Sequence, residues 1–260
     1  MQRMRRRRQA TATNEEATTV TVAYTVDCGD AITAARLSRA GDCFVCGTAA
    51  GVVLVWKRPE PQRHVLAYPP IHLYAHAGAV CSVAVSSAFS LIATGSADGT
   101  CVLWDSNRLT YRSTLRHRGA VAAVCVAPQH GDVYTLEARP GARPVLHLWS
   151  VNGDHVRART CEQQGRCMQL SAGPAGVAPN VVAVGNDNGS VSLYDAESLA
   201  PVNTLQAHQS VGITAIAFSS DGLHIYTGDT SGQVIDWYPV DPSSSSSSAA
   251  PAPSSSSSAS

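Results

Sequence analysis

The stretch AVCSVAVSSAFSLIATGSADGTCVLWDSNRLTYRSTLR (79–116) contains four consecutive runs of the kind that form β-strands. Most of these runs are rich in Val, Ile, Thr or aromatic residues, and polar turns separate them. The turn ADGT (97–100) carries a glycine, which adopts a positive φ without steric cost, and an aspartate, which can bind the nearby backbone. The stretch therefore predicts a four-stranded sheet whose third strand carries Trp104.

The same pattern recurs along the chain and is marked by an aromatic residue near the end of a short apolar run. These residues are Trp56, Trp104, Trp149, Tyr194 and Trp237, at intervals of 48, 45, 45 and 43 residues. A period of about 40–45 residues with Trp-Asp endings is typical of WD repeats, which form β-propellers with four strands per blade. The sequence therefore resembles an all-β WD-repeat propeller of five four-stranded blades. The expected blades are 30–74, 75–116, 117–161, 162–207 and 208–238.

Polar segments, 1–17 and 241–260, flank the repeat zone 18–240. The first is a basic and polar arm and the second a Ser/Pro/Ala tail, and both are expected to be disordered because they can bury little apolar surface. The last blade lacks a fourth strand, so we expect TTVTVAYTV (18–26) to pair with its third strand and close the ring. Two architectures remain open, a five-bladed ring and the end of a larger propeller, and the small blade number favours the second.

One blade carries all four residues of the structural tetrad of WD repeats. His76 precedes its first strand, Thr94 lies on the second, Asp98 in the tight turn and Trp104 on the third. The threonine hydroxyl can link the indole N–H to the imidazole, and the aspartate can bind the other imidazole nitrogen. Hydrolase triads contain similar groups, but this hydroxyl would be bound to a core tryptophan. Parts of the set recur elsewhere in the chain, which indicates that these four residues have a structural role rather than a catalytic one.

Other blades carry parts of the tetrad. The partial sets are His117 and Trp149 in the third blade, and His208, Thr227 and Trp237 in the fifth. In the fifth blade, Ser231 occupies the position expected for the aspartate. The first blade has Cys46 and Ala50 at the Thr and Asp positions. The fourth has Tyr194 and Asn188, with no histidine before its first strand.

The chain has eight cysteines and nine histidines, but their positions do not predict a metal or redox site. Most cysteines lie in apolar runs, where a thiol behaves as a small hydrophobic group. Cys43 and Cys46 are on a predicted strand, where positions i and i+3 face opposite sides, and no second pair completes a zinc site. His72 and His76 are expected in a loop without a third ligand. We expect no metal and no cofactor.

Charge and hydropathy exclude several classes of function. Lys+Arg and Asp+Glu number 19 each, so the chain has no general attraction for nucleic acid. No apolar run approaches the roughly 20 residues that span a bilayer, and the N-terminus lacks the apolar stretch of a secretory signal. Phosphate loops, dinucleotide fingerprints and nucleophile elbows are not found. The sequence predicts a cytoplasmic protein that keeps its thiols reduced and is not an enzyme.

Three longer phrases resemble one group of WD-repeat proteins. They are GTCVLWDSNRLTY (99–111), LHLWSVNGD (146–154) and FSSDGLHIYTGDTSGQVIDW (218–237). They resemble the C-terminal WD-repeat domain of BEACH-domain proteins of the beige/lysosomal-trafficking-regulator and neurobeachin type. The resemblance implies a scaffold for vesicle and lysosome-related membrane traffic, cytosolic or peripheral on membranes. No BEACH domain is found in the 260 residues, so the chain would be a fragment, a split gene product or a stand-alone relative.

The favoured function is a non-catalytic platform that binds other proteins, because a propeller presents variable loops on a rigid scaffold. The expected binding surface is the rim that carries the turns near Asp98, Asn188 and Ser231. The neighbouring loop 137–145 adds two candidate side chains, Arg139 and Arg143, which could pair with acidic groups of a partner.

A substrate receptor of a ubiquitin ligase is the alternative function. Such receptors resemble WD repeats that end in Trp-Asp-x-Arg. Here the motif WDSNR (104–108) is one residue longer, which weakens this hypothesis.

Overall fold

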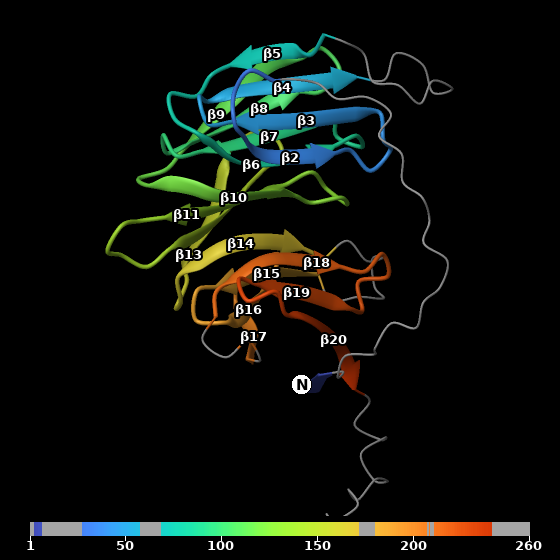
Figure 1. Cartoon of the computed structure of the whole chain (residues 1–260), viewed down its shortest axis with the longest axis vertical. Helices are drawn as coiled ribbons and strands as arrows, with labels where there is room; N and C mark the ends of the chain where they lie inside the picture. The colour runs from blue at the N-terminus through green and yellow to red at the C-terminus, as the bar shows by residue number, and fades with distance from the viewer. Residues whose placement is uncertain are drawn as a thin grey trace, which may run out of the picture.

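The computed structural model describes residues 3–6, 28–57, 69–171, 180–206, 208 and 211–240 (Figure 1). Every regular element within these ranges is a β-strand, and they contain no helix. The strand expected at 18–26 and the tail expected at 241–260 lie outside the described residues.

The strands form five four-stranded antiparallel sheets, called blades 1 to 5 here in chain order. Blade 1 contains β2 (Ile32–Leu37), β3 (Cys43–Thr48), β4 (Val52–Lys57) and β5 (Ile71–Tyr74). Blade 2 contains β6 (Val80–Ser86), β7 (Leu91–Ser96), β8 (Thr100–Asp105) and β9 (Thr110–Arg116). Blade 3 contains β10 (Ala120–Val126), β11 (Val133–Ala138), β12 (Val145–Trp149) and β13 (His155–Thr160). Blade 4 contains β14 (Gly165–Leu170), β15 (Val181–Asn186), β16 (Ser190–Asp195) and β17 (Pro201–Gln206). Blade 5 contains β18 (Ile213–Phe218), β19 (Ile225–Asp229), β20 (Val234–Val240) and β1 (Arg3–Arg6). The predicted all-β fold with five four-stranded sheets is confirmed.

All five blades share one backbone plan. In each blade the first two strands shift register near the start of the first strand, after the first residue pair in four blades and after the second in blade 3; in blade 2 the shift lies between Val80 and Ser82. A β-bulge of this kind increases the local twist of a strand. Its recurrence at one position shows that the five sheets are repeats of one structural unit.

The middle strands of the blades form the core. All six residues of β7 are buried, whereas all six residues of the outer strand β13 are exposed. The five aromatic residues that mark the repeat, called the aromatic anchors, are only 3–8% exposed; they are Trp56, Trp104, Trp149, Tyr194 and Trp237. The anchor of each of blades 2 to 5 packs with side chains of the preceding blade, and Trp56 packs within blade 1. The residues that revealed the repeat therefore fill equivalent places.

The blades follow one another around an open arc (Figure 1). The inner strands β2, β6, β10, β14 and β18 pack against each other in succession, and no contact of similar extent joins blade 1 to blade 5 among the described residues. Most of β2 and half of β18 are exposed as a result. The expected closure of the ring is not observed in the described part of the chain.

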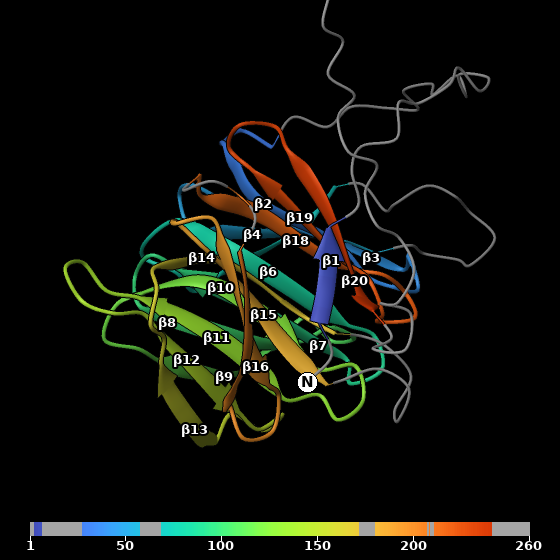
Figure 2. The same ribbon diagram turned by 90° about the horizontal axis from the view of Figure 1, so that it is seen from below.

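The fourth strand of blade 5 comes from the N-terminus. Arg3–Arg6 pairs antiparallel with Trp237–Val240 of β20, and the two strands lie side by side in Figure 2. The sequence correctly predicts that an N-terminal strand completes this blade, but it assigns the wrong segment, 18–26. The expectation that all of 1–17 is disordered is also wrong at Arg3–Arg6. The physical reason is the edge of β20, whose backbone groups would otherwise be unpaired and favour pairing with any available strand.

Candidate interaction surface

In blade 2, four side chains form a hydrogen-bonded chain from the core to one rim. Trp104 Nε1 donates to Thr94 Oγ1 at 3.1 Å, and the same oxygen lies 2.8 Å from His76 Nε2. His76 Nδ1 lies 3.3 Å from Asp98 Oδ2, which also accepts the backbone N–H of Ala77. The tight turn of the blade is thereby tied to its central strands.

Burial determines the charge state of this set. It lowers the pKa of His76, and the nearby Asp98 carboxylate only partly offsets the effect. Burial alone would raise the pKa of Asp98, but hydrogen bonds from Thr100 and Ala77 lower it. A neutral imidazole donates from Nδ1 to the carboxylate and accepts the Thr94 hydroxyl at Nε2. Thr94 is 0% exposed, so its hydroxyl cannot reach a substrate as a nucleophile.

Blade 5 has an equivalent chain with a carboxylate that the sequence analysis missed. Trp237 Nε1 donates to Thr227 Oγ1 at 3.0 Å, and His208 Nε2 lies 2.8 Å from that oxygen. His208 Nδ1 lies 2.7 Å from Asp229 Oδ2. Ser231, predicted at the aspartate position, instead donates its hydroxyl to Asp229 Oδ1 at 2.7 Å. Ser231 does stand four residues after Thr227, as Asp98 stands four residues after Thr94, but the histidine is bound by Asp229, which lies two residues after Thr227 on the same face of the strand.

Blade 3 has the threonine link without a carboxylate on the histidine. Thr135 Oγ1, which the sequence analysis did not assign, accepts from Trp149 Nε1 at 3.0 Å and lies 2.7 Å from His117 Nε2. His117 Nδ1 is buried and has no hydrogen-bond partner among the described residues. Burial, followed by the nearby His147, lowers the pKa of His117 to about 4. This imidazole is therefore neutral at physiological pH.

The carboxylate of blade 3, Glu137, binds two other side chains. It is 0% exposed and accepts from Arg139 Nε at 2.6 Å, while its Oε2 lies 2.9 Å from His147 Nε2. Burial would raise the pKa of Glu137, but the hydrogen bonds of Arg139 and His147 lower it to about 2. The candidate partner-binding residue Arg139 is thus engaged within the blade.

Blades 1 and 4 replace the histidine and threonine by less polar residues. Cys28 and Cys46 pack with Trp56 in blade 1. In blade 4, Cys161 is 1% exposed and its side chain is hydrogen-bonded to Tyr194. Burial raises the pKa of the Cys46 thiol to about 11. Cysteine therefore serves as core packing in both blades, and all eight cysteines are thiols.

The remaining polar candidates do not converge on a reaction centre. His72 lies on β5, not in the expected loop, and its Nδ1 is 3.2 Å from Tyr74 Oη. The described part of the chain has no group of three or more His, Cys, Asp or Glu side chains arranged to hold a metal ion. Likewise, it has no helix with the length and hydropathy needed to cross a membrane.

The rim near the tight turns presents few unpaired polar groups. Asn188 Oδ1 accepts the backbone N–H of Ser190 at 3.1 Å and its hydroxyl at 2.7 Å. Arg143 is exposed in the loop after β11, whereas Arg139 is paired with Glu137. Of the two arginine candidates from sequence, only Arg143 is available to a partner in this arrangement.

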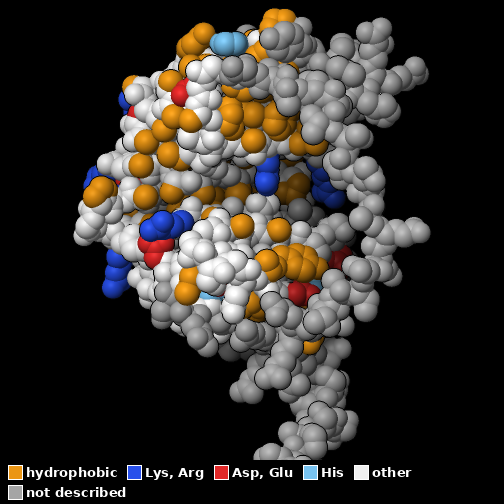
Figure 3. All heavy atoms as spheres, in the orientation of Figure 1, with side chains coloured by type: hydrophobic (Ala, Val, Ile, Leu, Met, Phe, Trp, Pro, Cys, Tyr) orange, Lys and Arg blue, Asp and Glu red, His pale blue; other side chains and the backbone are white. Residues whose placement is uncertain are grey.

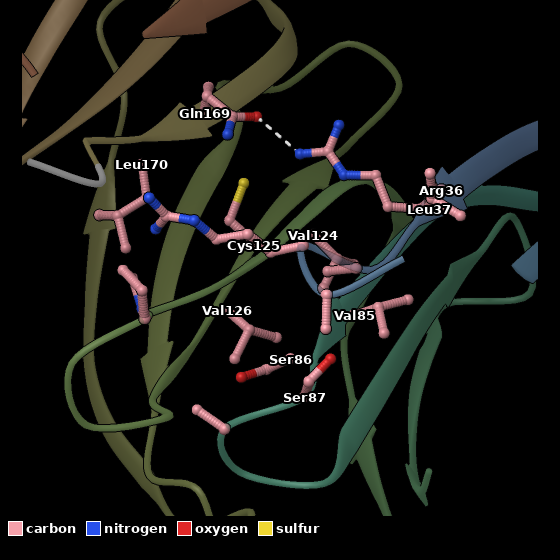
Figure 4. A pocket seen from close by; sticks show the side chains of 15 residues that line it. Arg36, Leu37, Val85, Ser86, Ser87, Val124, Cys125, Val126, Gln169 and Leu170 are labelled. Carbon is pink, nitrogen blue, oxygen red and sulfur yellow. Dashed lines mark hydrogen bonds between the residues drawn. The ribbon is translucent and has the colours of Figure 1, made fainter. Parts of the chain in front are cut away.

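A pocket of about 610 Å³ lies at the opposite end of the inner strands from the tight turns. Its polar side chains include Arg36 and Arg39 from blade 1 and Gln169 from β14, and apolar side chains form much of its wall. Arg36 donates to Gln169 Oε1 at 3.3 Å across the pocket (Figure 4). In Figure 3 the molecule has a hollow with basic side chains inside it. Sequence reasoning missed this site because it depends on residues from four blades.

The pocket has a net positive lining. No Asp or Glu is among the lining residues, and neither arginine is in an ion pair within the described ranges. At the pocket edge, the Ser87 hydroxyl donates to Asp42 Oδ1 at 3.2 Å. A few donors among apolar walls are typical of a recognition site.

Comparison with known proteins finds two stretches of the chain that are similar to WD repeats. The family model "WD domain, G-beta repeat" matches residues 68–105 and 199–235. The human lysosomal-trafficking regulator is 38% identical over 169 residues, which cover 64% of this chain and 4% of that protein. Human WD repeat- and FYVE domain-containing protein 4 is 34% identical over 177 residues, which cover 60% of this chain and 5% of that protein. The chain therefore spans a small part of the length of these relatives.

A solved structure shows the same fold. The crystal structure of the Cps50 (Swd1) β-propeller domain of Myceliophteria thermophila superposes with a TM-score of 0.66 at 16% sequence identity. The alignment covers 87% of this chain and 70% of that chain. At this identity the likeness concerns the propeller architecture alone.

Proposed function

We propose that this chain, a WD-repeat β-propeller similar in sequence to BEACH-type proteins, is a non-catalytic protein-binding scaffold in vesicle and lysosome-related membrane traffic. The observation that carries the proposal is the 38% identity to the lysosomal-trafficking regulator over 169 residues. The scaffold would act in the cytoplasm, or at membranes through its partners.

The polar side chains of the core are buried in structural hydrogen bonds, which supports a binding role rather than a catalytic one. The threonine hydroxyls of blades 2, 3 and 5 are fully buried and hydrogen-bonded to tryptophan and histidine. Each such bond contributes about 1 kcal/mol to stability. The groups that could resemble a hydrolase triad therefore stabilise the blades and leave the surface to recognition.

The pocket with Arg36 and Arg39 is the surface best suited to a protein partner. Guanidinium groups bind carboxylates through two parallel hydrogen bonds, and the apolar wall can bury aliphatic side chains. An acidic segment with neighbouring aliphatic residues matches both features. The rim with Arg143 is a second, smaller candidate surface.

Proximity labelling with the full chain in cells tests the function. We expect the labelled proteins to be dominated by components of vesicle and lysosome-related traffic. Labelling dominated by ubiquitin-ligase adaptors would support the alternative function and contradict the proposal. The structure adds no support for that alternative, because Asp105 of the motif at 104–108 binds Arg112 and the N–H groups of its own turn.

Two double variants separate the pocket from non-specific charge effects. R36Q/R39Q removes the basic groups of the pocket, and R157Q/R159Q removes two exposed arginines from the outer strand β13 as a matched control. We expect the first variant to lose the labelled partners and the second to retain them, with both melting like the wild type. Equal retention would assign binding to another surface, and equal loss would indicate non-specific attraction.

A further inference from the structure

Blade 3 carries two imidazole rings side by side near its outer edge. His147 lies on the third strand β12, and His155 begins the outermost strand β13. His147 Nδ1 and His155 Nε2 face each other at 3.2 Å, and the ring centroids are 5.4 Å apart. His155 is exposed, and the side chain of His147 is 13% exposed. A small ion can therefore reach the pair from solvent.

A β-bulge brings the two histidines to one face of the blade. The register of β12 and β13 shifts between Leu148 and Trp149, and Trp149 pairs with His155. His155 thereby lies on the same face as Trp149 and as His147, two residues earlier on the strand. Without the shift, His155 would point to the opposite face, and bulges commonly re-aim a side chain in this way. Sequence spacing does not reveal the pair, because the shift decides which face His155 takes.

The same shift occurs between the third and fourth strands of blades 2 and 4, where other side chains stand at the two positions. The equivalent residues are Val102 and Tyr111 in blade 2. They are Ser192 and Pro201 in blade 4. The shared backbone plan thus places two side chains next to each other, and of these three blades only blade 3 has histidine at both positions.

Glu137 determines which nitrogen of His147 is protonated. His147 Nε2 lies 2.9 Å from Glu137 Oε2, and an ionised carboxylate only accepts hydrogen bonds, so Nε2 carries the proton. Burial lowers the pKa of His147, which keeps the ring neutral at pH 7. Nδ1 therefore has a free lone pair that is directed at His155. Carboxylates hold metal-binding histidines in the required tautomer by the same contact.

Trp149 packs against both imidazole rings. Its ring stacks on His147 at a centroid distance of 5.9 Å and meets His155 edge-on at 4.7 Å. The indole is itself fixed, because it is 8% exposed and its Nε1 donates to Thr135 Oγ1 at 3.0 Å. Rings that are held in advance lose little conformational freedom when they bind an ion.

We propose that His147 and His155 chelate a Zn²⁺ ion between Nδ1 of the first ring and Nε2 of the second. Imidazole suits Zn²⁺, Cu²⁺ and Ni²⁺. With zinc–nitrogen distances of about 2.0–2.1 Å, the 3.2 Å separation gives an angle of about 100–105° at the metal. This angle is closer to the tetrahedral value of about 109° that Zn²⁺ adopts than to the right angle of a square-planar Cu²⁺ or Ni²⁺ site.

Binding requires small changes in the pair. His155 must carry its proton on Nδ1, and this change of tautomer releases no net proton. The ion then replaces the hydrogen bond between the rings and ties β13 to β12. The described part of the chain offers no third His, Cys, Asp or Glu ligand, so water takes the remaining positions. The site shares no residue with the pocket, and it is therefore independent of the proposed function.

Calorimetric titration of the full, untagged chain with Zn²⁺ tests the proposal. The chain carries C81S, which removes an exposed thiol that would compete for the ion. H155Q removes one ligand at an exposed position, and H130Q removes an exposed histidine elsewhere as the matched control. We expect H130Q to bind Zn²⁺ like the parent chain and H155Q to bind about 100-fold more weakly, since even the loss of an outer-shell partner costs about 10–100-fold. Mg²⁺ should give no binding, because it prefers oxygen ligands.

Nitrogen NMR of the imidazole rings locates the ion. Zn²⁺ should shift His147 Nδ1 and His155 Nε2 and leave the rings of His72 and His224 unchanged. Equal affinity of H155Q and the parent chain, or shifts confined to other histidines, would show an adventitious ion only and overturn the proposal. Absence of Zn²⁺ binding by the parent chain would also overturn it and would leave the two rings with a hydrogen bond alone. Circular dichroism without Zn²⁺ should show the same melting temperature for both variants and the parent chain.

Discussion

Blades 3 and 5 place a carboxylate at the same point of the same strand but use it for different contacts. Asp229 follows Thr227 by two residues and lies 2.7 Å from His208 Nδ1. Glu137 follows Thr135 by two residues, yet it binds Arg139 and His147. His117 Nδ1 is consequently left without a partner in the described residues.

The neighbours of the carboxylate explain the difference. The residue two positions after Asp229 is Ser231, a short side chain that donates to the carboxylate oxygen facing away from His208. The residue two positions after Glu137 is Arg139, whose guanidinium competes for both oxygens. On the third strand, His147 stands where blade 5 has the apolar Ile235. A tetrad histidine therefore keeps its carboxylate only where no cation lies closer to that carboxylate.

The largest expected effect comes from removing the threonine that links tryptophan to histidine in both blades. T227V should lower the free energy of unfolding by about 3 kcal/mol, because it leaves the buried Trp237 N–H and His208 Nε2 without their common partner at about 1–3 kcal/mol each. Valine has nearly the same shape, so no cavity contributes. Urea unfolding measures the change, and T230V at an exposed turn position is the control. A loss below about 0.5 kcal/mol would contradict the tetrad in blade 5.

The next effect is confined to blade 3. E137Q should destabilise the chain by about 2 kcal/mol, because the neutral amide cannot accept two charge-assisted hydrogen bonds from Arg139 and His147. The side chain of Arg139 is 30% exposed, so water recovers part of the loss. The control is E162Q at an exposed position. Similar unfolding midpoints for E137Q and E162Q would show that the buried contacts contribute little.

The unpartnered His117 predicts a specific loss of stability in acid. Its folded pKa is about 4, below the ordinary value of 6.5, so between these values the unfolded chain binds a proton that the folded chain does not. Stability should therefore fall as the pH is lowered from 6.5 to 4, by at most about 1.4 kcal/mol per pH unit for this group. H117Q should reduce that slope when unfolding is measured from pH 7 to 4.5. An unchanged slope would show that other groups, such as His76 and His147, cause the acid sensitivity.

The repeat, the blade ranges and the aromatic anchors could be read from the sequence because period and strand pattern are local properties. Asp229 was also readable, since residues two apart on a strand face the same side, but the spacing of blade 2, in which Asp98 lies in the tight turn, pointed to Ser231. The partner of Glu137 was not readable, because His147 reaches it from the neighbouring strand. For the same reason the pocket around Arg36 and the pairing of Arg3–Arg6 with β20 depend on positions that only the folded chain brings together.

The smallest effect would convert blade 3 to the arrangement of blade 5. E137D/R139S introduces the shorter carboxylate and the serine that blade 5 has at Asp229 and Ser231, and it removes the competing guanidinium. The carboxylate should then reach His117 Nδ1 and raise the pKa of that imidazole toward its ordinary value, since an opposite charge nearby favours the protonated form. Net stability at pH 7 should change by less than about 1 kcal/mol, because a hydrogen bond from His117 to the buried carboxylate replaces those from Arg139. NMR titration of the His117 ring protons measures the pKa, with R139S alone as the control. If the pKa stays near 4 in the double variant, His147 rather than Arg139 holds the carboxylate away from the tetrad.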